Sequence, residues 1–434
     1  MKKVLFAIIA LCLTVGCSKE IQSLPTNVTV SETKTTEETS VTTKEKTTEE
    51  TSTKESTSEI KESAEPPDNL VLNTRENMEV YEKVKISDFV TDTNVEITNG
   101  EDFIDTNEIG EFEATVNCKY EKGEFQQKVS YTVSDTTAPI LLNMGTSPYV
   151  QKGEPFNLSS IVGYADNYDS SPVLSYDGTV DTEKIGNYSI TATVTDSSGN
   201  QTSWDMNVVV LSEIPAPTPS EISDSDGTPF ADFIDTYSGD NRKFGIDVSA
   251  WQGDIDFNAV KEAGCEFVII RMGYFYDEIN IDDWYAENIR KAREAGLEVG
   301  VYFYTTANSA EDVRELAKYI SEQLDGQELD FPVAFDWEEF TTFQQYGMST
   351  HFLNELFNLF AIEMENYGYS AMLYGSRNVL NDVWTNEYNH PVWLAHYTDE
   401  TDYNGDYFMW QASSTGRIDG IDGYVDMNIL YTDR

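Results

Sequence analysis

The sequence has 434 residues, which is too long for one ordinary domain and long enough for several. Its 28 basic and 77 acidic side chains give a formal net charge of −49. A surface this acidic repels nucleic acid phosphates and anionic lipid heads, so we expect neither as a partner. It also means that a single acidic residue carries little information without its context.

The N-terminus reads as an export signal. Two lysines precede an apolar run over residues 4–15, which is too short to span a bilayer comfortably. The run ends in "LTVGC", which resembles the lipobox of bacterial lipoproteins and implies that Cys17 is diacylated. A plain signal peptide with a coincidental cysteine is the alternative. We predict a lipoprotein signal peptide over 1–17 and a protein anchored by lipid at the extracellular face of the bacterial cell membrane, reaching into the wall.

Two cysteines remain after the leader and the lipidated position, Cys118 and Cys265. They fall in different predicted domains, and two lone cysteines in an exported protein do not build a disulfide framework. We expect Cys265, in "AGCEFVII", to pack as a small buried hydrophobe.

Residues 18–67 consist almost entirely of Thr, Ser, Glu and Lys. A stretch without apolar side chains has nothing to bury, so its folding cannot offset the entropy cost of ordering it. We predict a disordered tether.

An internal repeat follows. "IDTNEIGEF" at 104–112 matches "VDTEKIGNY" at 180–188, and alternating strand-like sequence follows each copy. This pattern predicts two small antiparallel β-sandwiches, over 68–135 and 136–212. The second copy resembles the bacterial immunoglobulin-like modules of wall-associated proteins, and the first is a weaker match. The resemblance implies spacers or weak wall binders, without catalysis.

Three aspartates of the second sandwich, Asp166, Asp169 and Asp196, are of the residue type that binds calcium. Loop solvation is the simpler interpretation in so acidic a chain. The three histidines, His351, His390 and His396, lack ligand-like spacing. We therefore expect no metal and no cofactor.

A Pro-, Ser- and Asp-rich linker spans 213–242, and strand-like and helical patterns alternate over 243–434. Helical faces are predicted over 282–296 and 349–367. Near-continuous apolar strands alternating with helices favour a mostly parallel sheet, and eight strands suggest an irregular (β/α) barrel. The last three connections are short, so a regular helix after each strand is not expected. The strand candidates are 244–249, 267–273, 298–305, 332–338, 371–375, 391–397, 407–413 and 423–429.

Most of these strands are apolar until their carboxyl ends, where polar or aromatic residues appear. In a parallel barrel those ends open on one face, which is where active sites form. Four carboxylates would meet there, ringed by aromatic side chains. The residues concerned are Asp247, Arg271, Tyr302, Tyr304, Asp336, Glu338, Tyr374, Tyr397, Gln411 and Asp426.

The stretch "FPVAFDWEEF" places Asp336 and Glu338 two residues apart. Residues i and i+2 of a strand point the same way, about 6.5–7 Å apart along the backbone. Two carboxylates so close raise at least one pKa, which allows one of them to hold a proton and donate it to a leaving oxygen. Paired carboxylates beside aromatic rings are typical of glycoside hydrolysis.

A set of motifs, "FGIDVSAWQGDIDF", "FVIIRMG", "GVYFY", "FPVAFDWE", "WLAHY", "MWQASSTG" and "GIDGYVDMN", resembles glycoside hydrolase family 25, the muramidase-type lysozymes, over roughly 244–434. "DDWYAENIRKAREAGL" also fits, with Asp282, Tyr285 and Asn288 at the family's spacing. The resemblance implies an irregular β/α barrel and cleavage of the β-1,4 bond between N-acetylmuramic acid and N-acetylglucosamine. It implies that Glu338 is the general acid and that Asp336 orients the substrate acetamido group or stabilises positive charge. Asp247 and Asp426 would flank them.

The resemblance also implies a set of substrate-binding residues. They are Arg271, Tyr302, Tyr304, Tyr374, Trp393, Tyr397 and Gln411. Two positions depart from the family: Phe303 stands where histidine is frequent, and His396 where glutamine is common. These departures concern the subsites rather than the four carboxylates.

The predicted protein is a monomeric, surface-tethered peptidoglycan hydrolase with peptidoglycan strands as its partner. A chitinase-like hydrolase is one alternative, but Ala334 stands where a D-x-D-x-E pattern requires an aspartate. The other alternative is a catalytically inactive wall-binding lipoprotein, which would not need four retained carboxylates.

Overall fold

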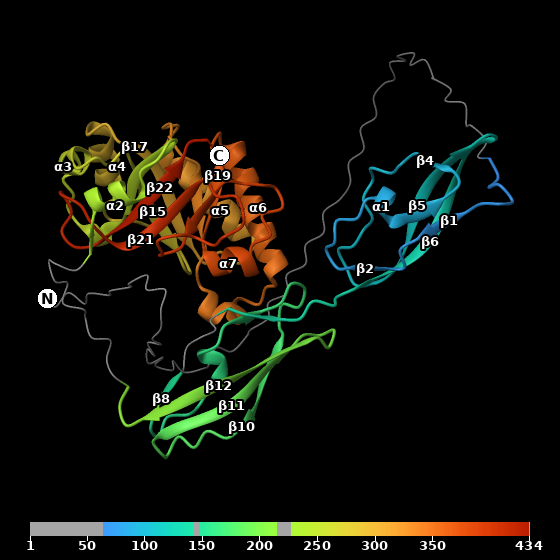
Figure 1. Ribbon diagram of the computed structural model, residues 1–434, viewed down its shortest axis with the longest axis horizontal. Coiled ribbons are helices and arrows are strands. Elements are labelled where there is room, and N and C mark those ends of the chain that lie inside the picture. Colours follow the sequence, from blue (N-terminus) through green and yellow to red (C-terminus); the bar gives the residue numbers. More distant parts are fainter. Residues whose placement is uncertain (1–63, 143–147, 215–226, 434) are drawn as a thin grey trace, which may run out of the picture. The chain divides into compact units, whose positions relative to one another are not determined.

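The computed structural model describes residues 64–142, 148–214 and 227–433. The predicted signal peptide with Cys17, almost all of the tether and most of the 213–226 segment lie outside the described residues. The chain divides into two compact units, Met1–Ser134 and Asp135–Arg434 (Figure 1).

The first unit contains a β-sandwich in its described part. A four-stranded sheet has the order β2-β6-β5-β4, and β1 pairs with β3. On β5 the residues Ala114, Val116 and Cys118 are buried and their neighbours point outward, so the period-2 alternation selects the core face. The elements are β1 (Leu72–Thr74), β2 (Asn77–Glu79), α1 (Ile86–Phe89), β3 (Val90–Thr93), β4 (Glu96–Ile97), β5 (Gly110–Tyr120) and β6 (Gly123–Ser134).

The second unit opens with a sandwich of the same plan. Its four-stranded sheet has the order β10-β11-β12-β8, and β7 pairs with β9. Ile190, Ala192 and Val194 of β11 and Val208 and Val210 of β12 fill its core. The elements are β7 (Ile140–Leu141), β8 (Tyr149–Gln151), η1 (Leu158–Ser160), β9 (Tyr164–Ala165), β10 (Val173–Gly178), β11 (Gly186–Thr195) and β12 (Gln201–Leu211).

The rest of the second unit is built on a sheet of eight main strands that closes on itself. The order is β14-β15-β17-β18-β19-β20-β21-β22, and β22 pairs with both β21 and β14. All pairs are parallel except the two that involve β22. The strands are β14 (Arg242–Val248), β15 (Phe267–Phe275), β17 (Glu298–Thr305), β18 (Val333–Asp336), β19 (Ala371–Ser376), β20 (Val392–Ala395), β21 (Met409–Arg417) and β22 (Val425–Tyr431).

Two short strands lie at the margins of this sheet: β13 (Thr228–Pro229) pairs with β21, and β16 (Ile279–Ile281) pairs with β15. All eight strands lie where the apolar runs predicted them.

Helices connect the parallel strands. The two predicted helices appear as α4, with Tyr285, Ile289 and Ala292 buried, and α6. Within 227–433 no helix follows β20 or β21, as the short connections predicted. The elements are α2 (Phe230–Tyr237), η2 (Ala250–Gln252), α3 (Phe257–Glu262), α4 (Tyr285–Glu294), α5 (Ala310–Leu324), η3 (Phe340–Tyr346), α6 (Thr350–Asn366) and α7 (Arg377–Asp382).

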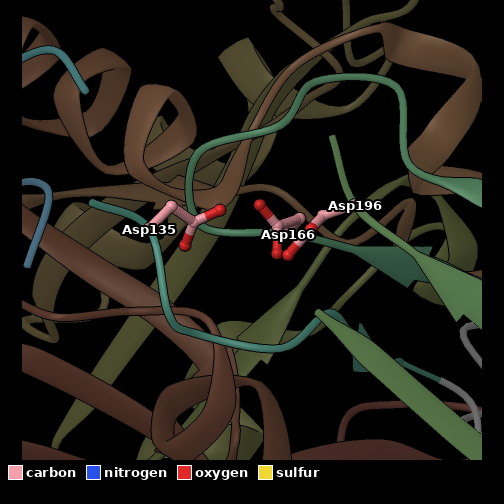
Figure 2. Close-up of side chains that lie close together, drawn as sticks. All are labelled: Asp135, Asp166 and Asp196. Carbon is pink, nitrogen blue, oxygen red and sulfur yellow. The ribbon is translucent and has the colours of Figure 1, made fainter. Parts of the chain in front are cut away.

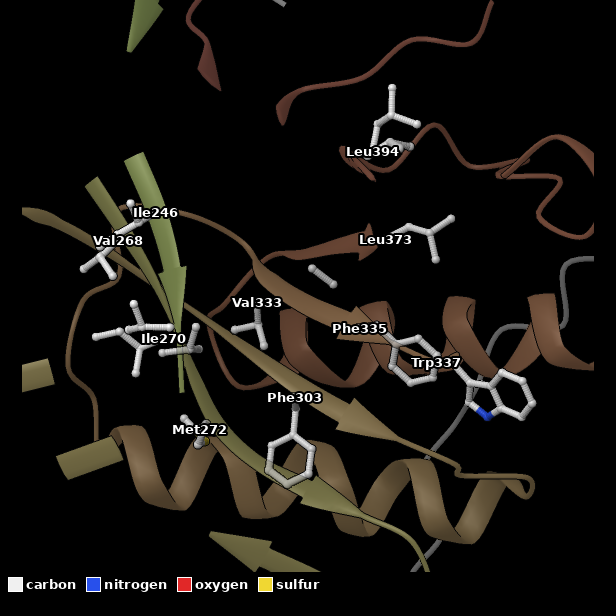
Figure 3. Close-up of a cluster of buried hydrophobic side chains, with 14 of the residues drawn as sticks. Ile246, Val268, Ile270, Met272, Phe303, Val333, Phe335, Trp337, Leu373 and Leu394 are labelled. Atoms are coloured by element: carbon white, nitrogen blue, oxygen red, sulfur yellow. The ribbon is translucent and has the colours of Figure 1, made fainter. Parts of the chain in front are cut away.

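Two apolar layers cover the two faces of the closed sheet. The outer layer packs against the helices and includes Ile246, Val268, Ile270, Phe335 and Trp337 (Figure 3). The inner layer fills the barrel with the residues that alternate with them: Phe267, Ile269, Phe331, Ala334, Met372, Tyr374, Trp393, Ala395, Met409 and Leu430. Strands buried on both faces explain why the sequence shows continuous apolar runs here.

Cys118 and Cys265 are both free and buried, as expected of two lone cysteines in separate domains. Among the described helices, none has the length and hydropathy needed to cross a membrane.

Candidate active site

Four carboxylates converge at one end of the barrel. Asp336 ends β18, Glu338 follows two residues later, and Asp247 lies near the end of β14, directly opposite Asp426 of β22. The charges of Asp247 and Glu338 both act on Asp336 and on Asp426, so the four groups form one electrostatic cluster. The predicted convergence is therefore present, with one correction. Asp426 lies near the start of its strand, and it reaches the same end of the barrel because β22 runs antiparallel to its neighbours.

Asp247 is held by two amide side chains. Its Oδ2 accepts hydrogen bonds from Gln411 Nε2 at 2.8 Å and Asn428 Nδ2 at 2.7 Å. Gln411 in turn accepts the hydroxyl protons of Tyr374 at 3.0 Å and Tyr397 at 2.9 Å through its Oε1. Burial raises the pKa of Asp247 to about 6, although the bonds from both amides oppose the shift.

Asn428 is oriented from beneath by Trp393, whose Nε1 donates to Asn428 Oδ1 at 2.8 Å. Trp393 is only 1% exposed and packs edge-on against Tyr374 in the barrel interior, with ring centroids 4.7 Å apart. The prediction that Trp393 contacts substrate is therefore wrong, because the ring lies too deep to meet a sugar. Tyr374 and Gln411, 7% and 3% exposed, likewise act mainly by orienting their neighbours.

Asp336 and Glu338 hydrogen-bond to each other and titrate as a pair. Burial, followed by the charges of Glu338 and Asp247, raises the pKa of Asp336 well above its usual range. Burial, followed by the charges of Glu339 and Asp247, raises the pKa of Glu338 to about 7. The pair therefore retains a proton near neutral pH, which a general acid requires.

Arg271 supplies the positive charge of the site. Its Nε donates to Asp282 Oδ2 at 2.8 Å, and its charge opposes the rise in the pKa of Asp336. Asp282 also accepts from the backbone N–H groups of Ala250 at 3.0 Å and Trp284 at 2.9 Å. Asp282 therefore fixes the Arg271 side chain and the segment that follows β14.

Aromatic residues line the cluster as predicted from the strand ends. Tyr302 interacts with the charges of Arg271 and of three cluster carboxylates, and the Tyr304 hydroxyl donates to Glu339 Oε1 at 2.7 Å. Tyr276 contacts the ring of Tyr304, with centroids 5.4 Å apart. Tyr276, Tyr397 and Trp251 are 39%, 43% and 49% exposed, which leaves ring surface open for a ligand.

Several of these residues escaped the sequence analysis as site residues. Asn428 lies two residues after Asp426 on the same strand face, and Glu339 directly follows Glu338, so position alone could have drawn attention to both. The residues that were missed are Tyr276, Glu339 and Asn428.

The two departures from the expected motifs lie away from the carboxylates. Phe303 is 1% exposed and belongs to the outer apolar layer (Figure 3). His396 pairs through Nδ1 with Thr401 Oγ1 at 2.9 Å. Neither side chain touches the acidic cluster.

Comparison with known proteins assigns two segments. Residues 246–421 match the family described as glycosyl hydrolases family 25, and residues 140–210 match the bacterial surface protein Ig-like domain. The autolytic lysozyme of Clostridium acetobutylicum is 31% identical over 188 residues, which cover 42% of this chain and 54% of that protein. Lysozyme M1 of Streptomyces globisporus is 30% identical over 200 residues, covering 42% and 66%.

Among solved structures, the bacterial lysozyme from Streptomyces coelicolor matches with 26% identity and a TM-score of 0.37, covering 43% of this chain and 90% of that one. The chain thus spans about half to two thirds of the length of the two curated relatives. The C-terminal barrel is a glycosyl hydrolase family 25 domain, carried on the same chain as a bacterial surface Ig-like domain.

Proposed function

We propose that this protein is an N-acetylmuramidase that cleaves the β-1,4 bond between N-acetylmuramic acid and N-acetylglucosamine in peptidoglycan. The observation that carries the proposal is the hydrogen-bonded Asp336–Glu338 pair, which retains a proton near neutral pH beside Asp247 and Asp426. A site that only bound glycan would gain nothing from holding four carboxyl groups together against their mutual repulsion. The membership of residues 246–421 in glycosyl hydrolase family 25 and the similarity to two lysozymes support the same function.

In this proposal Glu338 donates its proton to the glycosidic oxygen as the bond to the leaving sugar breaks. Glu338 is partly exposed, whereas Asp336 is 5% exposed, so Glu338 is the member of the pair that a substrate can reach. Asp336 then stabilises the positive charge that develops at the sugar, directly or through the acetamido group. Oδ1 of Asp336 accepts no hydrogen bond from the described residues, which leaves it available for this role.

Asp247 completes the mechanism by keeping the proton on the Asp336–Glu338 pair, and Asp426 hydrogen-bonds to Asp247. The charge of Asp247 raises the pKa values of Asp336, Glu338 and Asp426, and the amides of Gln411 and Asn428 keep Asp247 in place. The exposed rings of Trp251 and Tyr276 supply apolar faces on which sugar rings can pack.

The proposal is tested by peptidoglycan clearing with the full chain and its Glu338→Gln variant. Glutamine keeps the size of the side chain but cannot donate an acidic proton, so we expect the initial rate to fall at least about 100-fold. Glu355→Gln is the matched control, because Glu355 is exposed on α6 away from the cluster and should leave the rate unchanged.

Equal clearing by wild type and Glu338→Gln would remove Glu338 from the mechanism. Absence of clearing by wild type, with retained binding to walls, would favour the inactive wall-binding lipoprotein. Release of sugars from chitin in preference to peptidoglycan would favour the chitinase-like alternative.

A further inference from the structure

Three aspartates from separate segments converge in the Ig-like module of the second unit. Asp135 begins the unit, Asp166 directly follows β9, and Asp196 begins the turn between β11 and β12. Figure 2 shows their carboxyl groups pointing toward one another, and one oxygen of each lies within 4.8 Å of one oxygen of both others. They are the one such trio of potential ligands found within 64–142, 148–214 and 227–433.

All three side chains are buried, with 5%, 1% and 6% exposure for Asp135, Asp166 and Asp196. Oδ1 of Asp166 accepts the backbone N–H groups of Tyr168 at 2.9 Å and Asp169 at 2.7 Å. Its Oδ2 is fully buried and accepts no hydrogen bond from any described residue, and Figure 2 shows the Asp166 carboxyl group between those of Asp135 and Asp196.

Neighbouring hydrogen bonds orient the other two carboxylates. Both oxygens of Asp196 accept from Asn200, its backbone N–H at 2.8 Å and its Nδ2 at 2.8 Å, and Asp135 Oδ1 accepts from Thr137 N at 3.3 Å. No described Lys, Arg or His pairs with Asp166 or Asp196. Burial, followed in smaller part by the charges of Asp135 and Asp196, raises the pKa of Asp166 to about 6. Three buried like charges need a counter-charge to be stable together.

We propose that Asp135, Asp166 and Asp196 form a Ca²⁺ site in the Ig-like module. Carboxylate oxygens are the ligands that Ca²⁺ prefers, at about 2.3–2.6 Å from the ion. Two oxygens on one such ion lie at most about 4.6–5.2 Å apart, which matches the spacing of the trio. Mg²⁺ binds at about 2.0–2.1 Å and demands a tighter set, so it fits this spacing less well.

The site would brace the loop by which the module contacts the hydrolase domain. The backbone C=O of Asp166 accepts the N–H of Thr350 at 2.8 Å, and that of Asn167 accepts the N–H of His351 at 3.4 Å. Thr350 is the first residue of α6. Ca²⁺ bound by all three aspartates would thus connect Asp135 at the start of the module and Asp196 in the β11–β12 turn to the Asp166 loop, which contacts α6. This structural role does not depend on hydrolysis.

Calorimetric titration of the EGTA-treated full chain with CaCl₂, in about 0.1 M KCl to screen diffuse binding to the acidic surface, tests the proposal. We expect one saturable Ca²⁺ site in wild type, at least tenfold weaker or absent in Asp166→Asn. Asp177→Asn removes the same charge from an exposed position of β10 and should retain the site.

Thermal unfolding separates loss of the site from loss of the fold. Ca²⁺ should raise the unfolding temperature of wild type and of Asp177→Asn by several degrees but not that of Asp166→Asn. In EGTA the Asp166→Asn variant should be at least as stable as wild type, because it loses a repelling charge. Absence of saturable binding in wild type, equal binding by Asp166→Asn, or a site filled equally well by Mg²⁺ would each overturn the assignment.

Discussion

At the scale of single residues, the proton of the Asp336–Glu338 pair depends on the charges around it. The pKa of Glu338 is raised by burial and by the negative charges of Glu339 and Asp247, all of which disfavour the ionised carboxylate. No positively charged side chain is among the main influences on this pKa. The positive charge of Arg271 opposes the rise in the pKa of Asp336. The Nε of Arg271, however, donates its hydrogen bond to Asp282. The raised pKa of the proposed acid therefore results from burial and nearby negative charge without a compensating cation, and not from any unusual property of the carboxyl group itself.

Glu339 offers a test of this argument. Glu339→Gln removes the negative charge but preserves an acceptor for the Tyr304 hydroxyl. The pKa of Glu338, about 7 in wild type, should fall. Since the proposed acid works only while protonated, kcat/KM should decline above about pH 7 in wild type, and this decline should begin at a lower pH in the variant.

The measurement is the pH profile of kcat/KM on solubilised glycan strands. Glu355→Gln, an exposed carboxylate of α6, is the control and should keep the wild-type profile. A profile of Glu339→Gln that coincides with that of wild type would contradict the proposed origin of the pKa shift.

At the scale of elements, side chains alternate between the acidic cluster and the outer apolar layer at the end of β18 and in the two residues that follow it. Asp336 and Glu338 belong to the acidic cluster, whereas Trp337 is fully buried in the outer layer and its Nε1 donates to Ala307 O at 3.2 Å. The ring packs against Phe340 and Phe343 of η3, at centroid distances of 4.9 and 5.5 Å. Trp337 thus locks the backbone that carries both carboxylates.

The Ig-like module contacts this same region through η3. Gln344 donates from Nε2 to the backbone oxygens of Ser159 at 2.8 Å and Val162 at 3.2 Å. Gly163 lies so close to η3 that a Cβ there would collide with the backbone oxygen of Phe340. The module therefore supports the segment that leaves the catalytic strand.

Gly163→Ala should loosen this contact, because the backbone of η3 cannot yield to an added methyl group as a flexible side chain could. We expect faster hydrogen–deuterium exchange at the amides of Thr350 and His351, which donate to the module, measured by mass spectrometry on the full chain. Gly186→Ala is the control, since its new Cβ would meet only the Tyr188 ring, at 3.7 Å. Unchanged exchange in Gly163→Ala would show that the contact adds no protection.

At the scale of the whole molecule, the order of segments suits an enzyme that works at a distance from its anchor. The predicted lipidated Cys17 is separated from the hydrolase domain by a polar tether and two sandwiches, and the net charge of −49 opposes collapse onto anionic surfaces. We propose that lipid holds one end of the chain while the barrel reaches glycan strands in the wall.

Cys17→Ser tests the anchor. Without the thiol there is no acceptor for the diacylglyceryl group, so the variant should neither incorporate radiolabelled fatty acid nor sediment with membranes. Cys118→Ser, which alters a buried cysteine of the first sandwich, should behave as wild type in both assays. If Cys17→Ser protein still incorporated the fatty acid and sedimented with membranes, the lipid would be attached at another position and the prediction for Cys17 would be wrong.

Much of the barrel and its acidic cluster was predictable because both depend on short-range pattern. Apolar runs mark the eight strands, and the spacing of Asp336 and Glu338 places them on one face. The hydrogen bonds that Asp247 accepts were not predictable, because their donors Gln411 and Asn428 are 164 and 181 residues away in the sequence. The depth of Trp393 escaped prediction for a similar reason, since apolar strands facing either layer look alike.

The sequence by itself determined the positions of the eight barrel strands and the placing of Asp336 and Glu338 two residues apart at a strand end, because composition and alternation act over a few residues. The tertiary structure decided the reversed direction of β22, which brings Asp426 opposite Asp247, and the meeting of Asp135, Asp166 and Asp196 in one buried trio. Burial and electrostatic coupling arise only when segments distant in the chain come together. The raised pKa values of Asp336 and Glu338, and the gathering of three buried carboxylates at Asp135, Asp166 and Asp196, are therefore properties of the fold.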